Sequence, residues 1–278
     1  MKVVEKNYVS GEVTYKDYSE IMSNHMISSN AEILEKEELL MPNVIIGEDN
    51  RQIVETTTNF PYSAVLYLEV TFPSGQTGSG TAWMISDNAA ATAAHCLYDP
   101  NYGGWATTVK VWPGRNGYWS TPYGSATQTR IITSEAYVNA DNWIQVGGTL
   151  KNTLHGIDWG LIELNKDLGT DTGVISFAYF SDTTVANRAI RITGYPLQYQ
   201  YYQYEMLSSI TDYTASTLYF NNIDVTSGQS GSPVMGLGNV AFGIFTDEYV
   251  DEVDPKNYGV RITQGIYNVF NIFISECT

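Results

Sequence analysis

The sequence contains few of the residues that build disulfide frameworks, metal sites and membrane spans. Among its 278 residues are 2 cysteines and 3 histidines. Two cysteines cannot form a disulfide framework, and their spacing matches no metal-binding pattern. No unbroken apolar run approaches the roughly 20 residues of a membrane-spanning helix. We therefore expect a globular protein without a metal site or a helical membrane span.

Positive charge is also scarce. The chain has 14 Lys and Arg against 30 Asp and Glu, which gives a formal net charge of −16. The electrostatic field of this negative charge repels phosphates, which argues against nucleic acid or an anionic membrane as a partner. The same field favours peptides that carry Lys or Arg. Repulsion between like-charged subunits predicts a monomer. The chain is long enough for one large or two compact units.

Short strands are predicted from about residue 60 onward. β-Branched and aromatic residues dominate six segments, and Gly, Asn, Asp and Pro separate them. In this part of the chain a helical spacing of apolar residues appears only at 264–274. The pattern predicts an all-β body with a C-terminal helix. The six segments are 63–71, 107–112, 160–164, 189–193, 217–220 and 240–245.

Ser230 lies in a glycine-rich run, Gly228-Gln-Ser-Gly231. Glycines on both sides let the backbone turn sharply and would bring the N–H groups of Gly228 and Ser230 close to a substrate carbonyl oxygen. Such an arrangement suits a nucleophile with an oxyanion hole. On its own, however, the run more often indicates a polar loop.

Two upstream motifs favour the catalytic interpretation. His95 follows Thr-Ala-Ala, and Asp158 precedes the run Trp-Gly-Leu-Ile. A histidine base, a carboxylate that orients it and a serine that attacks thus occur in the chain order His, Asp, Ser, which is the order of chymotrypsin-type proteases. The three residues predict a triad in which His95 takes the proton of Ser230. This chemistry needs no metal and no organic cofactor.

The chain resembles the trypsin-like serine proteases, and among them the glutamyl endopeptidases secreted by Gram-positive bacteria. The resemblance implies a fold of two six-stranded antiparallel β-barrels, with a boundary near 165–190 and the catalytic groups in the cleft between them. It also implies a secreted endopeptidase that acts on proteins or peptides. Since the first residues lack the apolar stretch of a signal peptide, its leader would not be part of this sequence. The resemblance rests on five motifs in one order, at 44–51, 92–96, 158–162, 192–196 and 227–233.

Residues 1–43 contain none of these motifs. A short amphipathic helix is predicted at 31–41, where a proline follows. Because mature relatives begin near the equivalent of Val44, the resemblance implies that 1–43 is a pro-segment, cleaved after Asn43 to leave a protease domain at 44–278. The alternative is an N-terminal extension that is never removed.

The predicted specificity pocket departs from the glutamyl endopeptidase pattern. Members of that family are thought to bind the substrate carboxylate with a histidine and a threonine, and the matching positions here are Phe245 and Val225. A buried carboxylate without a donor is costly, so the resemblance to Glu-specific enzymes does not extend to this pocket. Asp224 lies where Lys- and Arg-specific relatives carry a pocket carboxylate, although some Glu-specific relatives also have Asp there, which leaves a structural role on its strand as the alternative. We expect a basic or large apolar side chain before the scissile bond. The predicted substrate-binding residues are Asp224, Val225, Phe245, Thr246, Asp247 and Glu248.

Two features leave alternatives open. Many relatives bridge a cysteine at the position of Cys96 to the preceding strand, but 77–81 contains no cysteine, so Cys277 is the only possible intramolecular partner. A Cys96–Cys277 disulfide and two free thiols are equally compatible with the sequence. The acidic run 247–254 lacks the glycine and ligand spacing of a calcium loop, which favours a solvated loop over a Ca²⁺ site.

Two other functions compete with the endopeptidase. A non-catalytic homologue that acts as a binding module is one, because fold does not fix function. The intact His95, Asp158 and Ser230 argue against it. An esterase with the same triad is the other, but an extended strand at 246–248 that could pair with a substrate backbone favours peptides.

Overall fold

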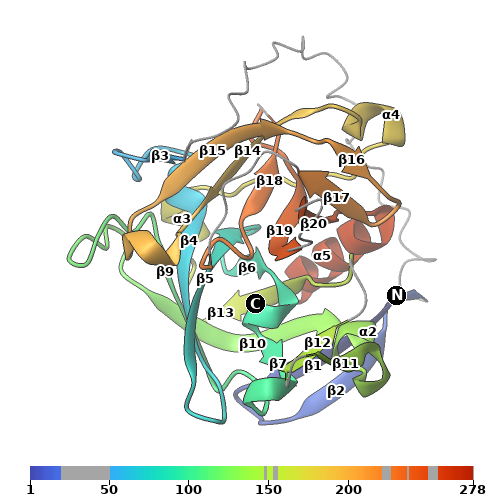
Figure 1. Ribbon diagram of the computed structural model, residues 1–278. Helices are drawn as coiled ribbons and strands as arrows, with labels where there is room; N and C mark the ends of the chain where they lie inside the picture. The colour runs from blue at the N-terminus through green and yellow to red at the C-terminus, as the bar shows by residue number, and fades with distance from the viewer. Residues whose placement is uncertain are drawn as a thin grey trace.

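The computed structural model describes residues 1–19, 51–146, 149–152, 156–220, 227–236, 238–249 and 256–277. Two large β-sheets form the body, and a C-terminal helix, α5 (Gln264–Glu276), packs beside them (Figure 1). No helix among the described residues is both long and apolar enough to cross a membrane. Several predictions fall outside the described residues, namely the helix at 31–41, residues 250–254 of the acidic run at 247–254, and Asn43, Val44, Asp224 and Val225.

The first sheet closes into a six-stranded barrel, as predicted. Its strands follow the order β13-β6-β5-β4-β9-β10, and pairing of β10 with β13 closes the ring. Side chains of β4, β9 and β10 fill the interior, where Leu66, Leu68 and Val109 are fully buried. The strands are β4 (Val65–Thr71), β5 (Thr77–Met84), β6 (Ala89–Thr92), β9 (Thr108–Pro113), β10 (Ala126–Ser134) and β13 (Gly160–Leu164).

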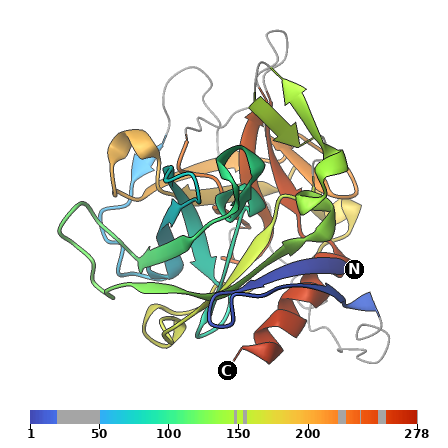
Figure 2. The same ribbon diagram turned by 90° about the horizontal axis from the view of Figure 1, so that it is seen from below.

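Two N-terminal strands extend the first sheet, and the sequence did not predict them. Strand β1 (Lys2–Asn7) pairs antiparallel with β10, and β2 (Val13–Asp17) pairs with β1. Seen from below, the hairpin lies across the barrel strands next to α5 (Figure 2). The first part of the expected pro-segment is therefore folded onto the body of the protein.

The second sheet is curled but open, which corrects the expectation of a second closed six-stranded barrel. Its order is β16-β17-β20-β19-β18-β14-β15-β3, and no pairing among the described residues joins its two ends. The end strands are too short to close a ring, since β16 and β3 have 2 residues each. The strands are β3 (Gln52–Ile53), β14 (Ala189–Gly194), β15 (Tyr204–Ser209), β16 (Asp212–Tyr213), β17 (Thr217–Phe220), β18 (Pro233–Met235), β19 (Ala241–Tyr249) and β20 (Lys256–Arg261).

Smaller elements connect the sheets. The short hairpins β7 (Tyr98–Asp99) with β8 (Gly104–Trp105) and β11 (Trp143–Val146) with β12 (Thr149–Asn152) project from the first barrel (Figure 1). The short helices are α2 (Glu135–Val138), α3 (Gly169–Thr172) and α4 (Asp182–Val185).

Helix α5 forms because its apolar residues recur at helical spacing and its first turn is capped. The Thr263 side chain accepts a hydrogen bond from the Ile266 N–H, as an N-cap does. The buried face packs on the first barrel, where the Phe270 ring lies 6.5 Å from that of Trp83 and 6.2 Å from that of Trp159. The C-terminus of the chain thus completes the core of the N-terminal half.

Candidate active site

His95 and Asp158 meet because their strands are neighbours. Strand β6 pairs with β13, with Thr92 opposite Gly160, so the residues just beyond these strand ends come together. His95 lies on a 3-10 turn, η3 (Ala94–Cys96), that follows β6. Its Nδ1 is 2.8 Å from Asp158 Oδ2, and its backbone N–H donates to Asp158 Oδ1 at 2.9 Å. Both carboxylate oxygens therefore hold this one histidine.

The surroundings of the imidazole change its protonation. Burial lowers the pKa of His95, but the charge of Asp158, its hydrogen bond and the neighbouring Cys96 raise it more, so that the pKa lies well above its ordinary value. The side chain is still 32% exposed, so a substrate can reach the ring. Such a group binds a proton readily, as a general base must.

The loop that carries Ser230 is held by the first barrel. The Thr81 N–H on β5 donates to Ser230 O at 2.9 Å, and the Thr81 hydroxyl donates to Gly228 O at the same distance. Cys96 Sγ lies 4.0 Å from Ser230 O, so the serine backbone contacts the turn of His95. Among the described residues no direct hydrogen bond joins the Ser230 and His95 side chains. The structure brings all three predicted residues to the junction of the two sheets.

Two glycines allow the Ser230 loop to approach its neighbours so closely. Gly228 has φ of 99° and Gly231 has φ of 90°, both in the region that favours glycine. A Cβ on Gly231 would collide with Thr81 O and with the Thr92 hydroxyl. In the described part of the chain, the N–H groups of Gly228 and Ser230 donate to no other protein group. These two donors are therefore available to a ligand.

Comparison with known proteins identifies the family. A model described as Trypsin matches residues 50–268 of the chain. The chain belongs to the trypsin family. It is 36% identical over 235 residues to a glutamyl endopeptidase of Bacillus licheniformis. The aligned region covers 81% of this chain and 67% of that relative.

Two further proteins are similar to this chain. The chain is 28% identical over 253 residues to a Bacillus subtilis protein named extracellular metalloprotease, covering 88% of this chain and 74% of that protein. Within the described residues, no group of three or more His, Cys, Asp or Glu could hold a metal ion. A solved structure of a Glu endopeptidase in complex with MPD matches with a TM-score of 0.70 and 25% identity, covering 84% of this chain and 100% of that one. This member of the trypsin family is a serine endopeptidase, and its substrates are proteins or peptides.

Two positioning contacts in this trypsin-family site were not predicted. Thr81 joins the Ser230 loop to β5, and its own carbonyl accepts from the Thr92 hydroxyl at 2.7 Å. Arg51 Nη1 donates to the side-chain oxygen of Gln229, the residue before Ser230, at 3.2 Å. Neither contact has a sequence signal, because each joins residues that lie far apart along the chain.

The described specificity positions lie on β19. Phe245 is 1% exposed and its ring is 6.2 Å from that of Phe220, within the core of the second sheet. Thr246 is fully buried and its hydroxyl donates to Tyr258 O at 3.1 Å. Asp247 and Glu248 continue the same strand. The ring of Phe245 offers no hydrogen-bond donor to a substrate carboxylate.

Both cysteines of the protease are free thiols, the second of the two alternatives that the sequence allowed. Cys96 packs against Gly80, where a Cβ would lie 2.9 Å from its sulfur. Cys277 accepts a hydrogen bond from Arg130 at 3.6 Å. Burial, with the charge of Glu163, raises the pKa of the Cys277 thiol to about 11, so it is a poor nucleophile at neutral pH.

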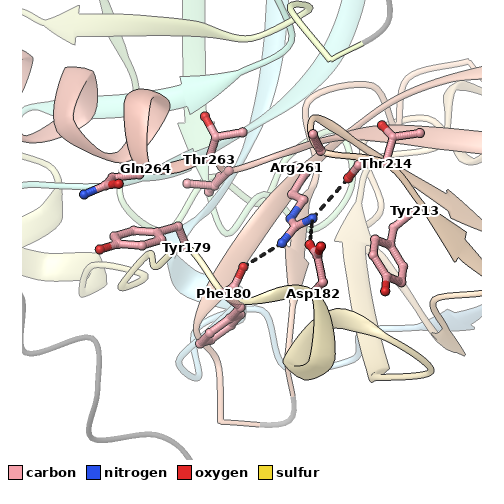
Figure 3. A pocket seen from close by; sticks show the side chains of 10 residues that line it. Tyr179, Phe180, Asp182, Tyr213, Thr214, Arg261, Thr263 and Gln264 are labelled. Atoms are coloured by element: carbon pink, nitrogen blue, oxygen red, sulfur yellow. Dashed lines mark hydrogen bonds and ion pairs between the residues drawn. The ribbon is translucent and has the colours of Figure 1, made fainter.

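A separate cavity of about 380 Å³ lies between α4 and β20 and is lined by none of the three predicted catalytic residues (Figure 3). Arg261 dominates it, and its guanidinium donates to Asp182 Oδ1 at 2.7 Å, to Phe180 O at 2.7 Å and to Thr214 O at 3.1 Å. The guanidinium is thus paired with protein acceptors, and its contact with Asp182 ties the start of α4 to β20.

Proposed function

We propose that this endopeptidase cuts peptide bonds through a triad of His95, Asp158 and Ser230. The observation that supports it is the pair of contacts from His95 to both oxygens of Asp158, at 2.8 and 2.9 Å. With Nδ1 bonded to the carboxylate, Nε2 is left to accept the Ser230 proton as the serine oxygen attacks the substrate carbonyl. His95 then protonates the leaving amine, and water hydrolyses the acyl-enzyme by the same route.

The N–H groups of Gly228 and Ser230 would form the oxyanion hole. Their lack of acceptors among the described residues supports this role, since the negative oxygen of the tetrahedral intermediate needs donors that are already in place. Loss of one such donor costs about 3–4 kcal/mol of transition-state stabilisation in related chemistry.

Replacing Ser230 tests the triad. Ser230→Ala should lower kcat by about a millionfold while the melting temperature stays unchanged, because the binding residues and the oxyanion hole remain. Ser227→Ala is the matched control, since Ser227 is an exposed serine of the same loop. A fluorophosphonate should label the wild type and Ser227→Ala but not Ser230→Ala. Wild-type turnover of casein by Ser230→Ala would refute the mechanism.

We further propose a specificity for basic or large apolar side chains before the scissile bond. The absence of a hydrogen-bond donor on Phe245 supports it, because a substrate carboxylate bound at this position would lack a partner. Cleavage of a peptide library, read by mass spectrometry, should show cuts mainly after such residues. Dominant cutting after Glu would contradict this proposal.

The remaining proposals concern maturation. We propose that the protein is a secreted monomer. It would be made as a zymogen and activated by cleavage after Asn43. In the active form, Asp224, Val225 and the strand at 246–248 would contact the substrate. The name of the Bacillus subtilis relative, which calls it extracellular, supports secretion. N-terminal sequencing of the active form should give Val44, and a start far from it would contradict the processing site.

A further inference from the structure

The hairpin formed by β1 and β2 covers an edge that the barrel leaves open. Strand β9 pairs only with Ala126 and Thr127 of β10. Beyond them, β1 takes over, in a register that runs from Asn7 opposite Arg130 to Val3 opposite Ser134. Without β1, this half of β10 would present unpaired backbone groups along an apolar strand, which folded proteins avoid.

Strand β1 is buried on both of its faces. Val3 is 0% exposed and belongs to the main hydrophobic core, and its neighbour Val4 is 1% exposed. Successive side chains of a strand point in opposite directions, so both faces of β1 are covered. On β2, by contrast, Val13 is 42% exposed. The hairpin therefore contributes an interior strand and an outer one.

A buried ion cluster also depends on the hairpin. Arg130 on β10 has a side chain that is 9% exposed, and it contacts Glu5 at 3.1 Å, Glu163 at 3.0 Å and Glu276 at 2.8 Å. Lys16 on β2 lies 2.9 Å from Glu5 and 3.4 Å from Glu276. Loss of the hairpin would remove Glu5 and Lys16 from this cluster and uncover Arg130, which would keep only Glu163 and Glu276 as carboxylate partners among the described residues.

The turn and the C-terminal end of the hairpin segment are anchored as well. The Tyr8 N–H donates to Thr129 O at 2.8 Å, and its hydroxyl donates to Ala106 O. Tyr18, which is 1% exposed, donates to Glu276 at 3.0 Å. These contacts reach the first barrel on one side and α5 on the other.

We propose that residues 1–19 are a permanent part of the first barrel and stay bound to β10 and α5 after the chain is cut. The mature enzyme would then consist of two chains, a protease domain and an N-terminal fragment that completes its sheet. This inference rests on the proposed cleavage after Asn43, but its test does not.

An engineered cut tests whether the fragment stays. A recognition sequence for a site-specific protease is placed within residues 26–36 of the full chain, in the Ser230→Ala background. After complete cutting, the fragment should co-elute with the protease domain in size-exclusion chromatography, and native mass spectrometry should give the sum of the two masses. Elution of the fragment apart from the domain without denaturant would overturn the proposal.

Two matched variants test whether the buried strand holds the fragment. Val3→Asp should release it after cutting, because a carboxylate cannot be buried there without a partner, whereas Val13→Asp should retain it. Hydrogen exchange of the cut, otherwise unaltered protein provides a readout that needs no variant. The β10 amides between Arg130 and Ser134 that face β1 should stay protected, and their rapid exchange would contradict the proposal.

The result of the engineered cut can be distinguished from a failure of the proposed processing site. If the active form proves to begin elsewhere than Val44, the processing site is wrong, but the engineered cut still reports on the fragment. If processing occurs after Asn43 and the engineered fragment leaves, only the proposal of a two-chain enzyme fails.

Discussion

A single histidine would carry the proton chemistry of the proposed triad, and its neighbours decide when it can act. Asp158 uses one oxygen on the His95 ring and the other on the His95 backbone, so the carboxylate fixes both the position and the charge of the base. The pKa of His95 is consequently raised well above its ordinary value near 6.5. A raised pKa keeps the imidazole protonated over a range in which a free histidine has already lost its proton.

The acid limb of the activity profile should therefore lie above the pH at which a free histidine titrates. Below the pKa of His95 the base is occupied by a proton, so kcat/KM should fall about tenfold for each pH unit, starting above pH 6.5. Asp158→Asn should shift this limb to lower pH, since the charge that raises the pKa is gone, and should lower kcat by about ten-thousandfold. Rate profiles on one peptide substrate measure both effects. A wild-type limb below pH 6 would contradict the raised pKa.

At the scale of elements, strand β5 supports the site from the first barrel. Thr81 holds the Ser230 loop, and one residue earlier Gly80 faces the sulfur of Cys96 on the turn that carries His95. A Cβ at Gly80 would lie 2.9 Å from that sulfur, close to the separation of about 3 Å between such atoms across a disulfide. The strand and the turn are thus already spaced for a covalent link.

Gly80→Cys should form a disulfide with Cys96. The closed loop would stabilise the fold by about 3 kcal/mol in the chain-entropy model, which corresponds to a rise in melting temperature of roughly 5–10 °C. Thiol titration in denaturant should find one free thiol, that of Cys277, in place of two. Gly80→Cys combined with Cys96→Ala is the control and should show no such rise. Three titratable thiols in Gly80→Cys would contradict the expected bridge.

At the scale of the whole molecule, the surface is strongly negative. The chain carries a formal charge of −16, and some of its few cations are used inside, since Arg115, Arg130 and Arg261 are buried. The field at the surface should therefore attract cationic peptides and repel acidic ones over distances that salt shortens.

Substrate capture should depend on ionic strength with a sign set by the substrate. Between about 20 mM and 500 mM salt, kcat/KM for a peptide rich in Lys and Arg should fall several-fold, because screening removes the attraction. A neutral peptide with the same residues next to the scissile bond should change little. Equal responses of the two peptides would show that the net charge does not steer binding.

Some elements have a sequence pattern typical of their secondary structure, and these could be predicted locally. Other elements form only because they pair with segments that are distant in the sequence. The strands at 160–164 and 217–220 agree with the prediction because they are short apolar runs, and the final helix agrees because its apolar residues recur at helical spacing. Strand β5 is rich in glycine and β6 is mostly alanine, residues of low strand propensity, so only their pairing in the barrel makes them strands. The second sheet is open because its end strands are too short to close a ring, and this pairing too could not be predicted from a local pattern.

The site shows the same division. His95, Asp158 and Ser230 stand in recognisable motifs, so the sequence could predict them before their proximity was known. Thr81 and Arg51 could not be predicted, because their roles arise from contacts with a loop about 150 or more residues away along the chain.

The pairing of β1 with β10 bears on how the protein can be produced. A gene trimmed to start at Val44, as the relatives would suggest, encodes a barrel whose exposed flank can join that of a second copy. Such a product is expected in inclusion bodies, and supplying the missing residues as a peptide during refolding should recover soluble enzyme.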